Sequence, residues 1–273
     1  MQVVGYDTAS GTLLVSHAAD HGNSAGNRDR RDDGTVESVA LDPGVELAWT
    51  LGDRHCAGTL AGWDGPGGPD HVVCGAPEAP YCPAHTSTWV CARCTGTCLK
   101  DEMDCYDDHA VYLAAFAPDA FKVGVTKLWR LETRLREQGA DRGAHLYTVS
   151  NGRIARELEA EIAGGPDPAL SDFVRVDTKR AGLGSTVDET AWERLLEGFD
   201  VLETFAFDYG LDLAERPVTE TIATGTVRGT KGRLLVLDHA GSTYAVDVRD
   251  LVGYELTEGG TGRDLQSSLG AFG

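Results

Sequence analysis

The sequence predicts an α+β chain in which β-rich segments at both ends enclose a Cys/His-rich region and a central module of strands and helices. Three observations support this. Residues 111–126 hold two alternating runs that are typical of strands. Apolar residues then recur at Leu128, Leu131 and Leu135, which is helical spacing. Residues 217–256 return to short alternating runs separated by glycine-containing turns.

The two ends of the chain are predicted to be antiparallel β regions. In residues 1–54, one hairpin turns at Ser10 and Gly11, and a second is broken by Asp42, Pro43 and Gly44. Residues 206–273 are predicted to form a small sheet or barrel followed by a mobile tail. Between them we expect a zinc-binding region over residues 55–109 and the central module over residues 110–205.

The charge of the chain is strongly negative, at −19, and few of its 24 basic residues are lysines. An acidic, Asp-rich and Lys-poor composition indicates adaptation to high intracellular salt, as in halophiles, where self-repulsion is screened. Acidity is then a weak argument against nucleic-acid binding. No apolar run reaches about eighteen residues and the N-terminus lacks signal-peptide features, so we expect a cytoplasmic protein without a membrane span.

All seven cysteines lie between Cys56 and Cys105, interspersed with histidines. In an intracellular chain such clustering favours metal ligands over disulfides. Two residues separate Cys91 from Cys94 and also Cys82 from His85, so each pair has the spacing of a zinc knuckle. The most compact ligand set for a structural zinc is therefore Cys82, His85, Cys91 and Cys94. A second site is a further hypothesis, with the candidates Cys98, Cys105 and His109.

The central module continues beyond the helix that Gly139 is expected to end. Thr126 is a candidate cap for the start of that helix. Residues 144–149 are predicted to be a third strand, followed by a helix that Ser150 or Asn151 caps. Residues 191–205 show the periodicity of another amphipathic helix.

Positive charge is concentrated in this module. Between Lys122 and Arg156 the chain holds eight basic and three acidic residues, a net charge of +5. A positive face of this kind suits a phosphate backbone, so we expect a nucleic-acid partner, DNA or RNA. The candidate contacts are Lys127, Arg130, Arg136, Arg142, Arg153 and Arg156.

Several residues of the module carry a family resemblance. Tyr112, Lys122-Val123-Gly124, Thr126 and Arg134-Leu135 resemble the GIY-YIG endonuclease module, closest to its phage-type branch. The longer string KVGVT…RLREQGA, with RHC, CARC and GRIARELE around it, resembles domain-of-unknown-function family 2797 over roughly residues 50–165. The resemblance implies a ββαβα order. It also favours a second zinc set, namely Cys56, Cys74, Cys91 and Cys94.

The resemblance further implies phosphodiester hydrolysis. Glu159 would hold a divalent cation, Mg²⁺ or Mn²⁺, and Arg134 would stabilise charge on the phosphate. Tyr112 would orient or deprotonate the attacking water, and Lys122 stands where the family usually has its second tyrosine. The sequence departs from the pattern at Ala110-Val111, which replaces Gly-Ile, and at Gln138, which replaces a common histidine.

Three functions therefore stand as hypotheses. The first is a zinc-containing protein that engages nucleic acid and acts as a divalent-metal-dependent phosphodiesterase or endonuclease. The second is a non-catalytic zinc-knuckle module that binds DNA or RNA. The third is a zinc-stapled adaptor for protein interactions.

Overall fold

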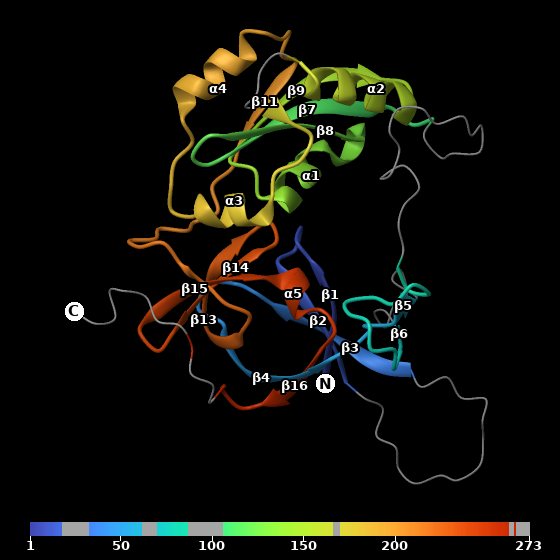
Figure 1. The fold of residues 1–273 in the computed structure, drawn as a ribbon, viewed down its shortest axis with the longest axis vertical. Helices are drawn as coiled ribbons and strands as arrows, with labels where there is room; N and C mark the ends of the chain where they lie inside the picture. Colours follow the sequence, from blue (N-terminus) through green and yellow to red (C-terminus); the bar gives the residue numbers. More distant parts are fainter. Residues whose placement is uncertain (18–32, 62–69, 87–105, 166–169, 262–264, 266–273) are drawn as a thin grey trace. The chain divides into compact units, whose positions relative to one another are not determined.

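The computed structural model describes residues 1–17, 33–61, 70–86, 106–165, 170–261 and 265. The fold is mixed α+β, and most of its regular elements are strands. The chain divides into two compact units: Met1–Ser87 with Pro217–Gly273, and Thr88–Arg216 (Figure 1). The sequence analysis placed boundaries near residues 54, 109 and 205, whereas the first unit joins segments from both ends of the chain.

The first unit holds one sheet, ordered β12-β15-β14-β13-β4-β16-β1-β2-β3-β6-β5. Its elements are β1 (Gln2–Asp7), β2 (Thr12–His17), β3 (Asp33–Ala40), β4 (Glu46–Arg54), β5 (Thr59–Ala61), β6 (Asp70–Val72), β12 (Val218–Thr219), β13 (Ala223–Lys231), β14 (Leu234–His239), β15 (Ser242–Asp247), α5 (Val248–Leu251) and β16 (Tyr254–Glu258).

The N-terminal and C-terminal β regions are not separate sheets in this unit. Strand β4 pairs with both β13 and β16, and β1 pairs with β16. Val3 and Leu13 from one end of the chain share a buried core with Leu235 and Leu256 from the other. Each region exposes an apolar face when alone, and pairing them buries both faces in one core.

The second unit holds a five-stranded sheet, ordered β10-β8-β7-β9-β11. Its elements are β7 (His109–Phe116), β8 (Ala120–Lys127), the 3₁₀-helix η2 (Leu128–Arg130), α1 (Leu131–Gln138), β9 (Arg142–Val149), α2 (Gly152–Ala163), β10 (Leu170–Ser171), α3 (Val176–Ala181), α4 (Glu189–Leu196) and β11 (Glu203–Ala206). The order from β7 to α2 is two strands, a helix, a strand and a helix, as the sequence analysis expected.

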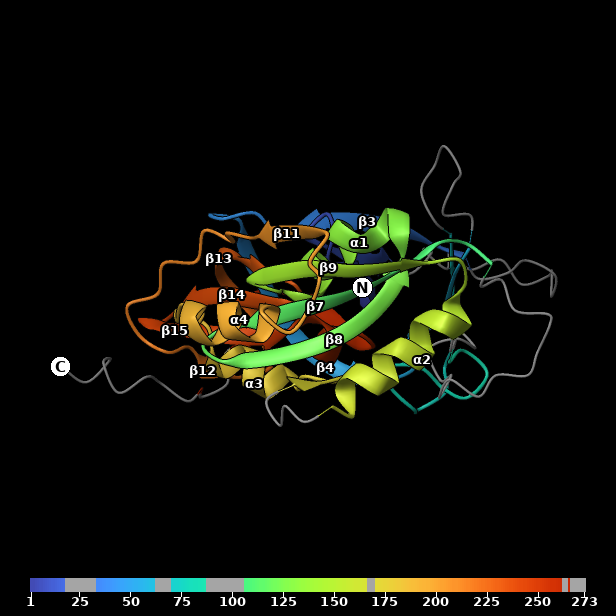
Figure 2. The ribbon, with the colours of Figure 1, turned by 90° about the horizontal axis from the view of Figure 1, so that it is seen from above.

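The central strand β7 is buried along its whole length, and its two sets of alternating side chains enter different cores. Val111 and Leu113 pack in a core that includes residues of α2 and α4. Tyr112 and Phe116 pack in the other core, against α1. Figure 2 shows α1 and α2 on opposite sides of the sheet. Each side chain of β7 is therefore assigned to one helix-covered face.

The helix ends follow local chemistry in most places. Gly139 closes α1 with a φ of 70°, and the Asn151 carboxamide oxygen accepts a hydrogen bond from the Ile154 N–H at 3.0 Å to cap α2. The cap expected at Thr126 is wrong, because Thr126 lies within β8 and α1 begins after the 3₁₀ turn. The helix expected over residues 191–205 ends at Leu196, and residues 203–206 pair with β9 instead.

No helix among the described residues is long and apolar enough to span a bilayer.

Gly124 provides a test of this packing. It pairs with Tyr112 across β7 and β8, and a Cβ added there would lie 2.6 Å from the Tyr112 hydroxyl oxygen. We expect Gly124→Ala to lower the free energy of unfolding by about 1–3 kcal/mol, because the ring must move. A urea titration measures this. Gly198→Ala is the matched control, since its Cβ would meet its nearest neighbour at 3.5 Å. Equal effects of the two substitutions would contradict the prediction.

Candidate functional site

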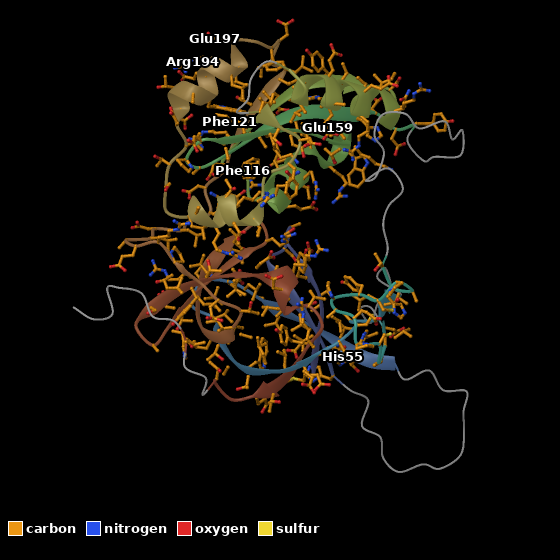
Figure 3. The ribbon with its side chains drawn as sticks, in the orientation of Figure 1. His55, Phe116, Phe121, Glu159, Arg194 and Glu197 are labelled. Carbon is orange, nitrogen blue, oxygen red and sulfur yellow. The ribbon has the colours of Figure 1, made fainter. Side chains whose placement is uncertain are left out.

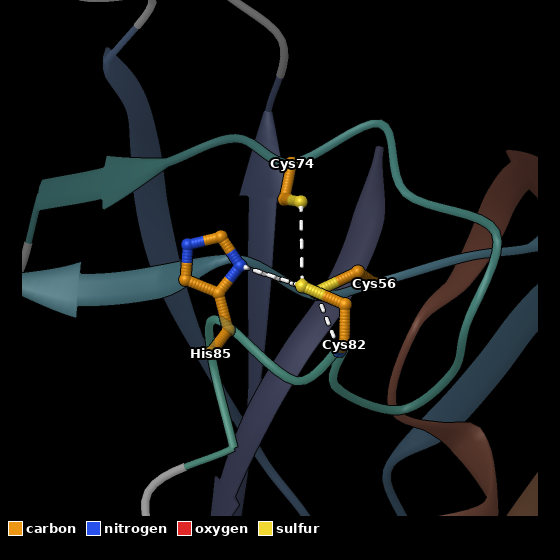
Figure 4. Close-up of side chains that lie close together, drawn as sticks. All are labelled: Cys56, Cys74, Cys82 and His85. Carbon is orange, nitrogen blue, oxygen red and sulfur yellow. Dashed lines mark hydrogen bonds between the residues drawn. The ribbon is translucent and has the colours of Figure 1, made fainter.

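Four metal-ligand side chains meet in the first unit: Cys56, Cys74, Cys82 and His85 (Figure 4). Cys56 lies just after β4, Cys74 just after β6, and the other two lie in the loop that follows. Their four candidate ligand atoms all lie within 4.8 Å of one another. His85 Nδ1 is 3.3 Å from Cys82 Sγ and 3.5 Å from Cys56 Sγ, and the Sγ atoms of Cys74 and Cys82 are 4.0 Å apart.

These separations fit a tetrahedral zinc site. Zn–S bonds of about 2.3 Å and Zn–N bonds of about 2.0–2.1 Å place two sulfurs about 3.8 Å apart and a sulfur about 3.6 Å from a nitrogen. The three separations given above differ from these values by only a few tenths of an ångström, and the other three are at most 4.8 Å. A Cys₃His set also fills all four positions, as structural zinc sites do. The cluster can therefore hold a metal such as zinc.

Hydrogen bonds around the cluster reach the sulfur of Cys56 and favour the thiolate form of Cys82. The N–H groups of Gly58 and Cys82 donate to Cys56 Sγ at 3.4 and 3.2 Å. Burial raises the pKa of Cys82, but hydrogen bonds from Cys56, from the backbone at Ala84 and from His85 outweigh it and bring that pKa to about 7. A thiol that ionises near neutral pH binds metal with little competition from protons.

Two histidines outside the cluster position its loops. His71 is buried between the Ser16 hydroxyl and the Ala57 carbonyl, each 2.8 Å from a ring nitrogen, and burial lowers its pKa, which keeps the ring neutral. His55 Nδ1 lies 3.1 Å from the Cys74 carbonyl oxygen. Gly58 has a φ of +65°, and a Cβ there would lie 2.1 Å from the Val72 carbonyl oxygen. The loop therefore requires glycine at this position.

The observed cluster takes two residues from each set suggested by the sequence. Cys82 and His85 belong to the compact set, and Cys56 and Cys74 belong to the set that the family resemblance favours. Both sets also contained Cys91 and Cys94, which lie outside the described residues, as do Cys98 and Cys105 of the second-site hypothesis. His109 is buried in β7, where its Nδ1 lies 2.6 Å from the Asp107 carbonyl oxygen.

The second unit brings together the four side chains to which the sequence analysis gave catalytic roles. They come from four elements: Tyr112 from β7, Lys122 from β8, Arg134 from α1 and Glu159 from α2. The register pairs Tyr112 with Gly124 and Lys122 with Ala114, so the tyrosine and the lysine share the face that α1 covers. Tyr112 and Lys122 each interact electrostatically with both Arg134 and Glu159. Figure 3 shows Glu159 on α2, where it is buried.

Tyr112 is 1% exposed, and its ring lies over Gly124. Its hydroxyl accepts a hydrogen bond from Gln138 Nε2 at 2.5 Å. Burial raises the pKa of Tyr112, and the charge of Arg134 and the bond from Gln138 offset this only in part. The hydroxyl is therefore protonated at neutral pH, which suits a hydrogen-bond donor better than a base.

Lys122 has a pKa that its environment moves toward neutral pH. Burial, with the charges of Arg134 and Arg156, lowers its pKa to about 8, although Glu159 and Asp172 act in the opposite direction. A lysine with this pKa is partly neutral in mildly alkaline solution. It can therefore accept a proton there.

The candidate nucleic-acid contacts are all engaged in ion pairs, which a count of charged residues along the sequence could not reveal. The pairs are Lys127–Asp107, Arg130–Glu137, Arg136–Glu132, Arg142–Glu189, Arg153–Glu157 and Arg156–Glu159. Four of these acids lie outside the stretch between Lys122 and Arg156, so folding reduces the local excess of positive charge. Apart from Arg156–Glu159, each pair has an exposed partner. Exposed pairs contribute only about 0–1 kcal/mol each, so a phosphate can replace the acid there.

The sequence analysis gave no positive role to three neighbours of the site: Gln138, His145 and Asp172. Gln138 lies four residues after Arg134, a spacing that places both on one side of α1 and was visible in the sequence. His145 pairs with Tyr112 across β9, next to a register shift between Val111 and Tyr112. This irregularity has no local signal in the sequence. Asp172 follows the two-residue strand β10, which pairs with β8 at Lys122.

The metal centre yields the first test here. Elemental analysis of the purified protein should show that Cys82→Ser and Cys56→Ser each remove one equivalent of zinc, and that combining them removes no more, because both ligate one ion. Cys91→Ser should leave that equivalent bound. If Cys91→Ser and Cys82→Ser instead remove the same equivalent, the ligand set differs from the observed cluster.

Lys122 yields a pH test. Its pKa of about 8 lies below the usual value near 10.4, so between these pH values the unfolded chain binds more protons and the lysine's contribution to stability rises with pH. Lys122→Met should raise the free energy of unfolding at pH 7 by about 1–3 kcal/mol. This gain should shrink toward pH 10.4. Denaturant titrations across that range measure the effect, with Lys127→Met as the control. A gain that does not vary with pH would refute the assignment.

Comparison with known protein families identifies the family of this chain. The family model described as a protein of unknown function, DUF2797, matches residues 76–256, which is more than half of the chain. Searches of the curated proteins and of the solved structures gave no significant match. The chain therefore belongs to the DUF2797 family, whose function is not established.

Proposed function

We propose that this chain is a zinc-containing protein that engages nucleic acid and hydrolyses phosphodiester bonds with a divalent cation. The observation that carries the proposal is that Tyr112, Lys122, Arg134 and Glu159, from four elements of the second unit, lie within electrostatic reach of one another. Two cations, a carboxylate and a phenol are the groups needed to bind a phosphate and a metal ion and to move a proton.

The arrangement of elements supports the same proposal. The resemblance to GIY-YIG endonucleases implies two strands, a helix, a strand and a helix, with the tyrosine on the first strand and the glutamate on the last helix. The second unit has this order, with Tyr112 on β7 and Glu159 on α2. Gly124 matches the glycine of the second motif, and the space it leaves is occupied by the Tyr112 ring.

Each residue has a role that follows from its environment. Glu159 would hold Mg²⁺ or Mn²⁺, which when bound neutralises charge on a phosphate oxygen and on the leaving group. The Arg134 side chain is 45% exposed, so its guanidinium can reach a phosphate and donate two parallel hydrogen bonds. Lys122, with its pKa of about 8, is the better proton acceptor for the attacking water. Tyr112, whose pKa is raised, would orient that water by hydrogen bonding.

The zinc centre has a structural role in this proposal. It lies in the first unit, and its Cys₃His set provides four ligands and no position for substrate. It would fix the ends of β4 and β6 without taking part in hydrolysis.

One contact favours a second candidate, a module that binds nucleic acid without cutting it. Arg156 donates to Glu159 at 2.5 Å, and both side chains are largely buried, so the carboxylate already has a cationic partner. A divalent cation must displace this partner to bind. If it cannot, Arg134 and its neighbours can still hold phosphate.

Cleavage assays separate the two candidates. We expect the wild-type protein to cut labelled single- or double-stranded DNA or RNA with Mg²⁺ or Mn²⁺ in high KCl. Glu159→Gln and Arg134→Ala should each lower the rate about 100- to 1,000-fold, because each removes stabilisation of transition-state charge. Arg194→Ala is the matched control, since this exposed arginine lies on α4, a helix that contributes none of the four site residues (Figure 3).

The outcomes distinguish the hypotheses when binding is measured alongside. Binding with no cleavage by any variant, in the folded and zinc-loaded protein, would favour the non-catalytic module. No affinity for any nucleic acid, even at the lowest salt at which the fold persists, would refute the proposal and leave the adaptor hypothesis.

A further inference from the structure

Trp129 is unusually exposed for a tryptophan. It lies in the 3₁₀ turn Leu128–Arg130 between β8 and α1, and 75% of it is accessible to solvent. The backbone holds this turn firmly, because the Leu128 N–H donates to the Asp108 carbonyl at 2.8 Å and Leu131, the next residue, is buried. The indole is therefore presented to solvent from a fixed position. Water contact over a surface this large and apolar costs free energy, which suggests that a ligand covers it.

The surroundings of Trp129 indicate an anionic ligand with an aromatic part. The Arg130 guanidinium lies 5.8 Å from the indole ring centroid, and Lys127 lies two residues earlier. The neighbouring side chains on either side are Leu128, which is partly buried, and Arg130. A protein partner would be expected to meet a cluster of apolar side chains. An exposed aromatic ring beside cationic side chains is instead the arrangement that binds single-stranded nucleic acid.

A continuous set of contacts connects this tryptophan to the candidate catalytic face. Arg130, stacked beside the indole, donates to Glu137 at 2.7 Å, and Arg134 donates to the other oxygen of Glu137 at 3.1 Å. The Glu137 side chain is 16% exposed, so it holds the two arginines in a defined geometry. Arg134 in turn interacts with Tyr112 and Lys122. The phosphate-binding arginine and the exposed ring thus belong to one connected surface.

We infer that Trp129 stacks on an unpaired nucleobase of a strand whose phosphate lies at Arg134. The inference rests on the proposed function and deepens it, because it assigns single-stranded or locally unpaired nucleic acid as the substrate class. A base within a duplex is already stacked on both sides and cannot offer its face to the indole. Every base has such a face, so the contact would tolerate any sequence.

The test is a double-mutant cycle that needs no cleavage. Binding of a labelled oligothymidylate, its RNA counterpart and a duplex of the same length is measured with Glu159→Gln protein, with and without Trp129→Ala. A fourth ligand is the single strand with an abasic site at one position, which is moved along the strand. The abasic strand keeps its phosphates and lacks one base, so it removes the partner of the indole and little else.

We expect Trp129→Ala to weaken binding of the intact single strand about 5- to 150-fold, the range of one base–aromatic stack. At one abasic position the substitution should have almost no further effect. Trp129→Phe should keep most of the affinity, and duplex binding should change little. Leu202→Ala is the matched control, because Leu202 is 61% exposed and precedes β11, an edge strand that β7 and β9 separate from β8. The loss for DNA compared with RNA identifies the preferred strand.

Three results would overturn the inference. If single strands bind and Trp129→Ala has no effect, the stacking is wrong while the proposed function stands. If Trp129→Ala weakens the intact strand and every abasic strand equally, the residue does not contact a base. If the substitution changes the oligomeric state instead, a second copy of the chain covers the ring. Failure of every nucleic acid to bind would refute the proposed function itself.

Discussion

The burial of β7 on both faces is the constraint on which the second unit depends. All eight residues of this strand are buried, and they pair with β8 on one side and β9 on the other. Successive side chains must therefore enter different cores. The side chains of Tyr112 and Phe116 therefore point to the face that α1 covers. Lys122 lies on the same face because it pairs with Ala114. The geometry of the candidate site is thus a consequence of strand register.

The candidate site gathers polar groups that a core built for stability alone would avoid. Tyr112 is buried with its hydroxyl bonded to Gln138, Lys122 has its pKa lowered to about 8 by burial, and Glu159 is buried against Arg156. Desolvating such groups costs free energy that partners recover only in part. Their gathering at one place, beside a register shift between β7 and β9, is typical of a site where function opposes stability.

Local patterns in the sequence were sufficient for β7, β8, α1, β9 and α2, but not for β11, where a helix was expected. Alternation predicted β7 and β8, and Gly139 and Asn151 marked the ends of helices as the structure has them. Gln138 could have been assigned to the site from its spacing to Arg134. The pairing of His145 with Tyr112 could not, because the register of β7 and β9 shifts between Val111 and Tyr112 and no local pattern encodes this shift.

Charge and long-range pairing show the limit of the local patterns more clearly. The count between Lys122 and Arg156 gave a positive face, but Arg142 on β9 pairs with Glu189 on α4, and Lys127 pairs with Asp107 from the loop before β7. These contacts depend on the fold. The joining of the two ends of the chain by β4 also lay beyond local patterns, because strands with similar alternation can pair in many ways and only the shared core selects among them.

The metal centre and this joining of the two ends support each other. The Gln2 carboxamide Nε2 donates to the carbonyls of Cys56 and Gly253 at 3.4 and 3.1 Å, so β1, the first ligand and the turn before β16 are held together. Gly253 has a φ of +94°, and a Cβ there would lie 2.4 Å from the His55 carbonyl oxygen, one residue before that ligand. An ion bound to the cluster would fix Cys56 relative to Cys74 and Cys82, and through these contacts it would fix both chain ends. Its binding free energy then becomes free energy of folding for the first unit. Spacing in the sequence indicated the pair Cys82 and His85, but Cys56 and Cys74 could be placed beside them only by a sheet whose strands lie far apart along the chain.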